Sequence, residues 1–121
     1  MSTLNGVWGE IYAARYLREN GFLIRTANYR TRLGEIDIIA EENHELLFVE
    51  VKTRSEGMLA QPMESVDRNK QRRLTLAAQQ YLKAEPPDTH ARFDVIEVYL
   101  DAQSKPIRVH HIRNAFDRAD R

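Results

Sequence analysis

GEIDIIAEENHELLFVEVKTR, residues 34–54, is the stretch that decides the fold. It holds two runs rich in β-branched and other apolar residues, 35–40 and 46–52, and such runs are typical of strands. The polar residues 41–45 between them predict a turn. The stretch therefore predicts a β-hairpin.

Charged residues interrupt both strands of this hairpin. Because side chains alternate between the two faces of a strand, Glu50 and Lys52 should share a face with Phe48. By the same rule Asp37 should share a face with Ile39. A buried charge must be paired or must hold a metal. The charges therefore indicate a functional site within the hairpin.

Composition limits the class of protein. A chain of 121 residues suits a single domain, which we place at 1–121, and the absence of cysteine excludes disulfides and thiolate metal sites. The N-terminus has no signal-peptide pattern, and no apolar run is long enough to span a membrane. We therefore expect a soluble, cytoplasmic protein without a membrane partner. The 18 basic and 18 acidic residues cancel, which argues against a general basic field and leaves room for a local basic patch.

The first helix is predicted over residues 5–20, with Gly21 just past its end. It is apolar around much of its circumference, so we expect it to be largely covered. Glu10 lies within its apolar stripe and is either paired with an arginine or a backbone amide, or part of a site. The stripe consists of Val7, Ile11, Ala13, Ala14 and Leu17.

The other elements follow from periodicity and from Gly and Pro breaks. After the first helix we expect strands at 22–30, 35–40 and 46–52, a loop at 55–63, a helix from Asp67 to 83 or 84, and strands at 92–100 and 107–112. The order α-β-β-β-α-β-β predicts an α/β fold, in which a mixed β-sheet with a central antiparallel hairpin is flanked by helices.

The start of the second helix is basic. Asp67 is a suitable N-cap, and the first turns carry Arg68, Lys70, Arg72 and Arg73. Because a helix N-terminus already attracts anions, these residues predict a phosphate site. A solvated basic face is an equally open interpretation.

The hairpin charges predict a metal-dependent chemistry. Asp37 and Glu50 on neighbouring strands can converge on one hard cation, and oxygen ligands suit Mg²⁺ or Mn²⁺. The carbonyl of Val51 is a candidate third ligand, and Glu10 can bind the water shell of the metal. Lys52 can activate water or meet a phosphate oxygen. Such a site would generate a hydroxide nucleophile for attack on a phosphodiester.

Asp37 followed by Glu50-Val51-Lys52 resembles the D…(D/E)-x-K core of the PD-(D/E)XK nuclease superfamily. The whole chain resembles a narrower group, the YraN-like family of small bacterial proteins, which is similar in fold to archaeal-type Holliday junction resolvases. The stretches that carry this resemblance are Gly9-Glu10 with Ala13-Ala14 and Leu17, Asn28-Tyr29-Arg30, Gly34 to Ala40, Phe48 to Arg54, Lys70 to Leu74 and Arg92 to Val95.

The resemblance implies a restriction-endonuclease-like fold, with Asp37 and Glu50 as metal ligands, Lys52 as the catalytic lysine and Glu10 as an acid from the first helix. The sequence departs from the superfamily at residue 36, where isoleucine replaces a proline. Glu35 should share the face of Asp37, so either acid can be the main ligand. The Gln-x-x-x-Tyr signature of the RecB-like branch is not met, because alanine stands four residues before Tyr81.

Our leading hypothesis is a Mg²⁺- or Mn²⁺-dependent nuclease that hydrolyses DNA, on branched or single-stranded substrates. One rival is a nucleic-acid-binding module that keeps the fold and cleaves nothing. Another is a protein-interaction adaptor that uses the aromatic stripe of Trp8, Tyr12 and Tyr16. A homodimer would suit both this stripe and a two-strand substrate. The residues assigned to nucleic-acid binding are Lys70, Arg72, Arg73, Arg54 and Arg30.

Two further signals lie near the C-terminus. Asp94 is either another site acid or the partner of Arg92 or Arg30. His110 and His111 are adjacent on a strand, so they should lie on opposite faces and cannot chelate one metal together.

Overall fold

The computed structural model describes residues 4–55 and 67–116, so the predicted loop lies, from residue 56 on, outside the described residues. The elements are α1 (Leu4–Glu19), β1 (Leu23–Arg30), β2 (Glu35–Glu42), β3 (Glu45–Ser55), α2 (Arg68–Leu82), β4 (His90–Leu100) and β5 (Pro106–Phe116). This is the predicted α-β-β-β-α-β-β order. In the part of the chain that is described, no helix has the length and apolar character needed to cross a membrane.

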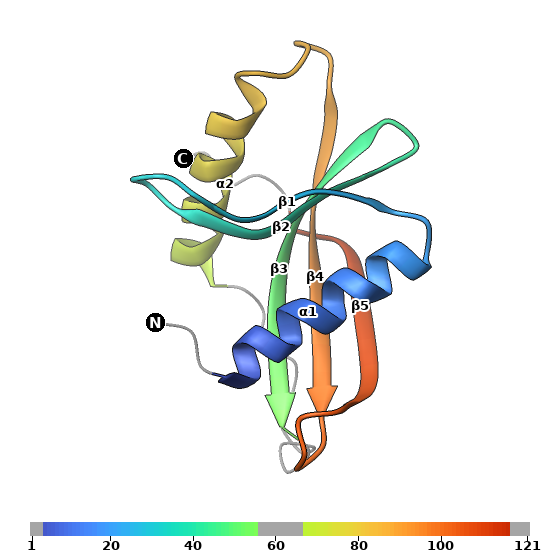
Figure 1. Cartoon of the computed structure of the whole chain (residues 1–121). Helices are drawn as coiled ribbons and strands as arrows, with labels where there is room; N and C mark the ends of the chain where they lie inside the picture. The colour runs from blue at the N-terminus through green and yellow to red at the C-terminus, as the bar shows by residue number, and fades with distance from the viewer. Residues whose placement is uncertain (1–3, 56–66, 117–121) are drawn as a thin grey trace.

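The five strands form one mixed sheet in the order β1-β2-β3-β4-β5. β3 and β4 are parallel, and the other neighbouring pairs are antiparallel. Helix α1 lies against one face and α2 lies by the other, while the β1–β2 hairpin crosses the long strands β3 to β5 at a large angle (Figure 1). The predicted fold class, a mixed sheet with a central antiparallel hairpin and flanking helices, is confirmed.

Each face of the sheet has its own apolar core. The α1-side core joins α1 to alternate residues of β2, β3 and β4, among them Leu17, Ile38, Val49 and Ile96. The α2-side core joins α2 to the intervening residues and includes Ile39, Phe48, Leu74, Ala78 and Val95. The two cores make the central strands apolar on both faces, as is expected for internal strands.

The predicted caps at the end of α1 and at the start of α2 are both confirmed. Gly21 adopts a φ of +88°, and its N–H donates to the carbonyl oxygen of Arg18 at 3.1 Å. The N–H of Phe22 donates to the carbonyl oxygen of Leu17 at 3.0 Å, which completes a Schellman motif. At the start of α2, the Asp67 carboxylate accepts a hydrogen bond from the N–H of Lys70 at 2.8 Å.

The expectation that α1 is largely covered is wrong. Val7, Trp8 and Ile11 are 43%, 37% and 44% exposed, whereas Ala13 and Leu17 are fully buried. The physical reason is the direction in which the helix contacts the sheet. A Cβ at Gly9 would meet the side chain of Thr53 on β3, so α1 packs through the line of Gly9, Ala13 and Leu17.

Four of the five strands are longer than the sequence indicated, whereas β1 begins one residue later than predicted. Asn43 and His44 turn the β2–β3 hairpin with φ values of 51° and 66°, which suit a two-residue turn with positive φ at both positions. The strands therefore pair up to Glu42 and Glu45. β5 continues to Phe116 at the edge of the sheet.

Candidate active site

The site lies where β2 and β3 part. Their paired residues end at Ile38 and Val49, so Asp37 and Glu50 stand just beyond the ladder. There, Oδ2 of Asp37 accepts a hydrogen bond from the backbone N–H of Val51 at 2.8 Å. Figure 1 shows the start of β2 and the end of β3 running apart from this point. A carboxylate thus takes over a backbone donor that the sheet no longer uses.

The strand alternation of β2 is interrupted at the same place. Ile36 and Ile39 both pack in the α2-side core, whereas Ile38 packs in the α1-side core. Asp37 lines a groove on the α1 side together with Ile38. The prediction that Asp37 shares a face with Ile39 is therefore wrong, because strict alternation fails where the two strands separate.

Glu50 lies on the α2 side, on the face of Phe48 as predicted, and only 5% of the residue is exposed. Its Oε2 lies 3.8 Å from Nζ of Lys52 on the same strand and 3.4 Å from Nζ of Lys70 on α2. Lys70 was predicted to hold the substrate backbone, and in the structure it also contacts the acidic pair. Two ammonium groups thus converge on one buried carboxylate oxygen.

The two carboxylates affect each other unequally: the charge of Asp37 raises the pKa of Glu50, whereas a side-chain hydrogen bond with Glu50 lowers the pKa of Asp37. Burial, and then the charge of Asp37, raise the pKa of Glu50 to about 7. Burial also raises the pKa of Asp37, although the N–H of Val51 and the charge of Lys70 offset part of the effect. Two neighbouring carboxylates can share a proton, and when both are ionised they are stabilised by a shared cation.

The residues present fit a magnesium-type cation. Within residues 4–55 and 67–116, no three His, Cys, Asp or Glu side chains lie close enough to hold a metal among themselves. Asp37 and Glu50 would therefore hold the metal as a pair, with water and substrate oxygens in the other positions, as Mg²⁺ prefers. The contact that the structure gives Val51 is through its N–H, and its carbonyl as a ligand stays a prediction.

Glu10 approaches the pair from α1. It is half-buried, and burial followed by the charges of Asp37 and Glu35 raises its pKa. The side chain of Asn28 on β1 hydrogen-bonds to it. Asn28 was missed by sequence reasoning. Its φ of +54° is an unusual conformation within a strand that asparagine tolerates, and the available signal was its place in the Asn28-Tyr29-Arg30 stretch, which carries part of the family resemblance.

Glu35 lies outside the pair. Its carboxylate is 3.2 Å from Nε of Arg30, and the two side chains are 49% and 70% exposed. It is Asp37 that contacts β3, which makes Asp37 the better-placed ligand of the two acids. Arg30 also borders the α1-side groove that Asp37 lines.

The other predicted phosphate contacts separate into two groups. Arg72 and Arg73 are exposed near the start of α2. Arg54 instead forms an ion pair with Glu97 on β4 at 3.4 Å, and only 13% of its side chain is exposed. Glu97 also lies 3.0 Å from Nδ1 of His110. Arg54 is thus committed to a buried partner, which the sequence could not reveal without knowing that β4 lies beside β3.

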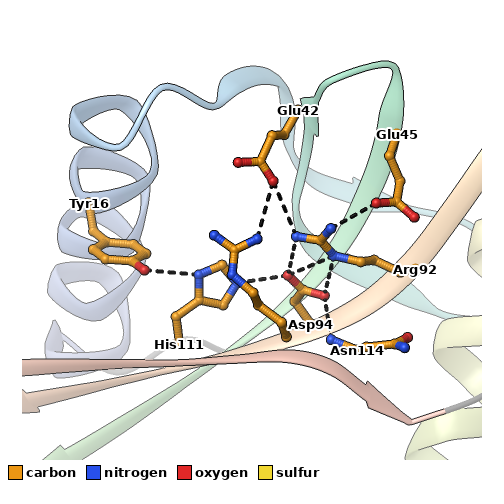
Figure 2. Close-up of polar contacts among 8 residues, drawn as sticks. Tyr16, Glu42, Glu45, Arg92, Asp94, His111 and Asn114 are labelled. Atoms are coloured by element: carbon orange, nitrogen blue, oxygen red, sulfur yellow. Dashed lines mark hydrogen bonds and ion pairs between the residues drawn. The ribbon is translucent and has the colours of Figure 1, made fainter.

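Asp94 belongs to a separate buried network, shown in Figure 2. It is fully buried on the α1-side face, opposite to the face of Glu50, and accepts from Nε of Arg92 at 3.0 Å and from the N–H of Asn114 at 3.0 Å. Nε2 of His111 lies 2.7 Å away, and the other ring nitrogen contacts the Tyr16 hydroxyl at 3.0 Å.

This network is structural. Arg92 also pairs with Glu42 and Glu45 at the tip of the β2–β3 hairpin, so the cluster joins α1, the hairpin, β4 and β5 (Figure 2). Although burial alone would raise it, hydrogen bonds from His111 and Arg92 hold the pKa of Asp94 below its usual value. Of the two interpretations of Asp94, the structure supports the partner of Arg92. The prediction that His110 and His111 lie on opposite faces is confirmed.

Comparison with known proteins finds one protein family, by its family model and by individual relatives. The model of the uncharacterised protein family UPF0102 matches residues 9–98, a range that contains Glu10, Asp37, Glu50, Lys52 and Lys70. A UPF0102 protein of Alkaliphilus oremlandii is 47% identical over 114 residues, which cover 92% of this chain and 96% of the relative. A UPF0102 protein of Bacteroides thetaiotaomicron is 44% identical over 111 residues, which cover 92% and 90% of the two chains.

Proposed function

We propose a function from the site of this chain, which belongs to the uncharacterised protein family UPF0102, the YraN-like family that its sequence resembles. The proposed function is that of a metal-dependent nuclease that hydrolyses phosphodiester bonds in DNA. The cofactor of this proposal is Mg²⁺ or Mn²⁺, and the partner is DNA. The catalytic residues of the proposal are Glu10, Asp37, Glu50 and Lys52.

One observation carries the proposal. Two carboxylates, the half-buried Asp37 and the buried Glu50, lie together at the gap between β2 and β3, and two lysines reach Glu50 from different elements. A protein that needed only stability would not place two acids there, because buried like charges are costly unless something neutralises them. The pair is instead suited to a reaction that needs a divalent cation and an anionic substrate.

Each side chain has a distinct part in this chemistry. A metal ion held by Asp37 and Glu50 would lower the pKa of a bound water molecule and would neutralise charge on the phosphate. The ammonium group of Lys52, beside Glu50, orients the attacking water or a phosphate oxygen. Lys70 stands in the first turn of α2, where the helix N-terminus and the ammonium both favour phosphate. Glu10 accepts a hydrogen bond from water on the α1 side.

Cleavage assays test the proposal. Linear duplex, single-stranded, flapped and four-way DNA are incubated with the protein and Mg²⁺ or Mn²⁺, beside Asp37→Asn, Lys52→Ala and the exposed control Lys83→Ala. We expect both site variants to lose about a hundredfold or more in rate, because each removes a group that acts in the transition state, and the control to keep its rate.

Two results would oppose the proposal. Cleavage that Asp37→Asn and Lys52→Ala retain would mean that the activity comes from another site or another protein. DNA binding that metal leaves unchanged, with no cleavage of any substrate, would favour the binding module.

The structure does not favour the adaptor hypothesis. The Tyr12 hydroxyl donates to the carbonyl oxygen of Ser104 at 3.2 Å, and the Tyr16 hydroxyl contacts His111 at 3.0 Å. Both tyrosines pack against the α1-side core. Two of the three residues of the aromatic stripe therefore pack within the molecule, and the third, Trp8, stacks on Tyr12 and is 37% exposed.

A further inference from the structure

A groove runs between α1 and β1 and reaches Asp37, one member of the acidic pair. It has a volume of about 530 Å³ and is bounded by α1, β1 and the start of β2. Glu10 and Asp37 lie along it, and Arg15 and Arg18 line it further along α1. At a rise of 1.5 Å per residue, Arg15 stands about 8 Å and Arg18 about 12 Å along the helix axis from Glu10.

Part of the apolar stripe of α1, which we expected to be covered, forms the helical wall of this groove. Val7, Ile11, Ala14 and Arg18 follow one another at helical spacing and all line the groove. Val7 and Ile11 remain 43% and 44% exposed. Neighbouring exposed apolar residues on one helix face, rimmed by charged residues, are typical of an interaction surface.

The charges along the groove are arranged for an anionic chain. Arg15 and Arg18 are exposed and form no ion pair within the described part of the protein, and Arg15 lies over the ring of Tyr12 at 5.5 Å. The acids stand at the other end, where a bound metal reverses the local charge. A ligand with regularly spaced negative charges, one at the metal and others about 8–12 Å further on, matches this order.

The volume of the groove favours one strand over two. A volume of about 530 Å³ is that of a site for a small organic ligand, and it accommodates a short piece of one strand but not a duplex. Single strands are bound by cationic grooves whose side chains contact both the backbone and the base faces.

We propose that the groove between α1 and β1 holds an unpaired DNA strand that leads to the Asp37–Glu50 pair. Arg15 and Arg18 bind successive phosphates of this strand, and Val7 and Ile11 contact its bases. The proposal rests on the proposed nuclease function for the identity of the strand, and it names the form of substrate that the site accepts.

The test measures binding separately from cleavage. A fluorescently labelled single-stranded oligonucleotide with phosphorothioate linkages, and a duplex of the same sequence, are titrated with protein in EDTA and in Mg²⁺ while anisotropy is followed. The variants are Arg15→Gln/Arg18→Gln and Ile11→Glu, which alter exposed side chains. The control Lys83→Gln/Lys105→Gln removes two positive charges outside the groove.

We expect Arg15→Gln/Arg18→Gln to weaken single-strand binding about tenfold at 50 mM salt. The slope of log Kd against log salt should fall by about 1.4, because each phosphate contact of a single strand contributes about 0.7. Ile11→Glu should weaken binding to a similar degree without removing a cation. The control should change the affinity less than twofold, and duplex binding should be unaffected by the groove variants.

The outcomes separate this proposal from the nuclease proposal. Loss of strand binding in the groove variants, with no cleavage by the wild type, supports the groove and overturns the nuclease function. Cleavage that Asp37→Asn abolishes, with unchanged strand binding in both groove variants, overturns the groove and keeps the nuclease. A wild-type dimer that Ile11→Glu dissociates, with no strand binding, also overturns the groove proposal, because a protein surface would then cover it.

Discussion

At the scale of the residue, Glu50 combines a functional position with a cost in stability. It is 5% exposed, and its pKa is raised to about 7, so its ionised form opposes folding at pH 8 when no metal is present. Lys52 and Lys70 are 28% and 38% exposed and can be hydrated without Glu50. We expect Glu50→Gln to raise the Tm of the metal-free protein at pH 8 by roughly 3–6 °C while abolishing cleavage.

A matched control is available on the same face of the sheet. Glu97 is 1% exposed, and its carboxylate pairs with Arg54 and lies 3.0 Å from His110. Glu97→Gln would leave Arg54 without a partner and should destabilise the protein by about 3 kcal/mol. Adding Mg²⁺ should raise the Tm of the wild type and not that of Glu50→Gln. An equal fall in Tm for both Glu→Gln variants would mean that Glu50 is a structural acid.

The pKa shift of Asp94 predicts a pH dependence of stability that is opposite in sign to that of Glu50. Its pKa is lowered in the folded protein, so the folded state binds fewer protons there than the unfolded state. The stability that Asp94 contributes is therefore present above its unfolded pKa of about 3.8 and is lost as the pH falls through the lower folded value. Asp94→Asn should cost about 3 kcal/mol at pH 7, because Arg92 loses a buried partner.

Urea unfolding between pH 2 and pH 7 checks this prediction. The free energy of unfolding of the wild type should fall below about pH 4, and that of Asp94→Asn should change less over the same range. Asp88→Asn, at an exposed position in the turn before β4, should keep the wild-type profile. An unchanged profile for Asp94→Asn would show that the network of Figure 2 contributes little to acid stability.

At this scale, contacts within one strand could be predicted from the sequence, and contacts between distant segments could not. Glu50 and Lys52 could be placed together because strand alternation is local. The partner of Arg54 could not be predicted, because Glu97 is 43 residues away and adjacent only through the parallel pairing of β3 and β4. The face of Asp37 was predicted wrongly, since alternation carries no information about where two strands stop pairing.

At the scale of the element, one close backbone approach positions helix α2, which flanks the site. A Cβ at Gly34 would lie 2.1 Å from the backbone carbonyl oxygen of Arg73, so α2 passes directly over the start of β2. Because the contacting atom is backbone, the whole helix must move to accommodate a methyl group. This approach fixes the start of α2, and with it Lys70, relative to Glu50.

Gly34→Ala should therefore reduce both stability and activity. We expect a loss of about 1–3 kcal/mol in the free energy of unfolding, and a fall in cleavage rate of about tenfold or more as Lys70 is displaced. Gly21→Ala is the control, because a Cβ there has no neighbour within 4 Å and is strained only by the φ of +88°. It should cost about 1 kcal/mol and leave the cleavage rate unchanged. Equal rates for the two variants would mean that α2 does not position the site.

The elements themselves were largely predictable, and their environment was not. Both helices could be predicted from their periodicity and from the capping residues Gly21 and Asp67, because these signals depend only on neighbouring residues in the sequence. The same periodicity cannot distinguish an apolar stripe that packs in a core from one that lines a groove. Val7 and Ile11 on α1 were therefore expected to be covered, although the helix turns a different side, that of Gly9, toward β3.

At the scale of the whole molecule, the two basic surfaces lie on different sides of the sheet. The groove with Arg15 and Arg18 is on the α1 side, and Arg72 and Arg73 are on α2, by the other face (Figure 1). The acidic pair lies between them, where β2 and β3 part. A linear strand contacts only the groove, whereas DNA with an unpaired strand beside a duplex arm can contact both surfaces at once. With a net charge of zero, such local contacts and not a general field must supply the affinity.

This arrangement predicts a preference for DNA with a junction between paired and unpaired parts. We expect the wild type to bind a flapped substrate about tenfold more tightly than a single strand of the same length, because the duplex arm adds phosphate contacts. Arg72→Gln/Arg73→Gln should remove this preference and leave single-strand binding intact, whereas Arg15→Gln/Arg18→Gln should weaken binding to both substrates.

Because the two surfaces are separate, the losses of binding free energy in the two double variants should add in the combined variant. Anisotropy titrations of all four proteins measure these losses. If Arg72→Gln/Arg73→Gln weakens both substrates equally, the two surfaces act on one strand and the preference for a junction has no structural basis.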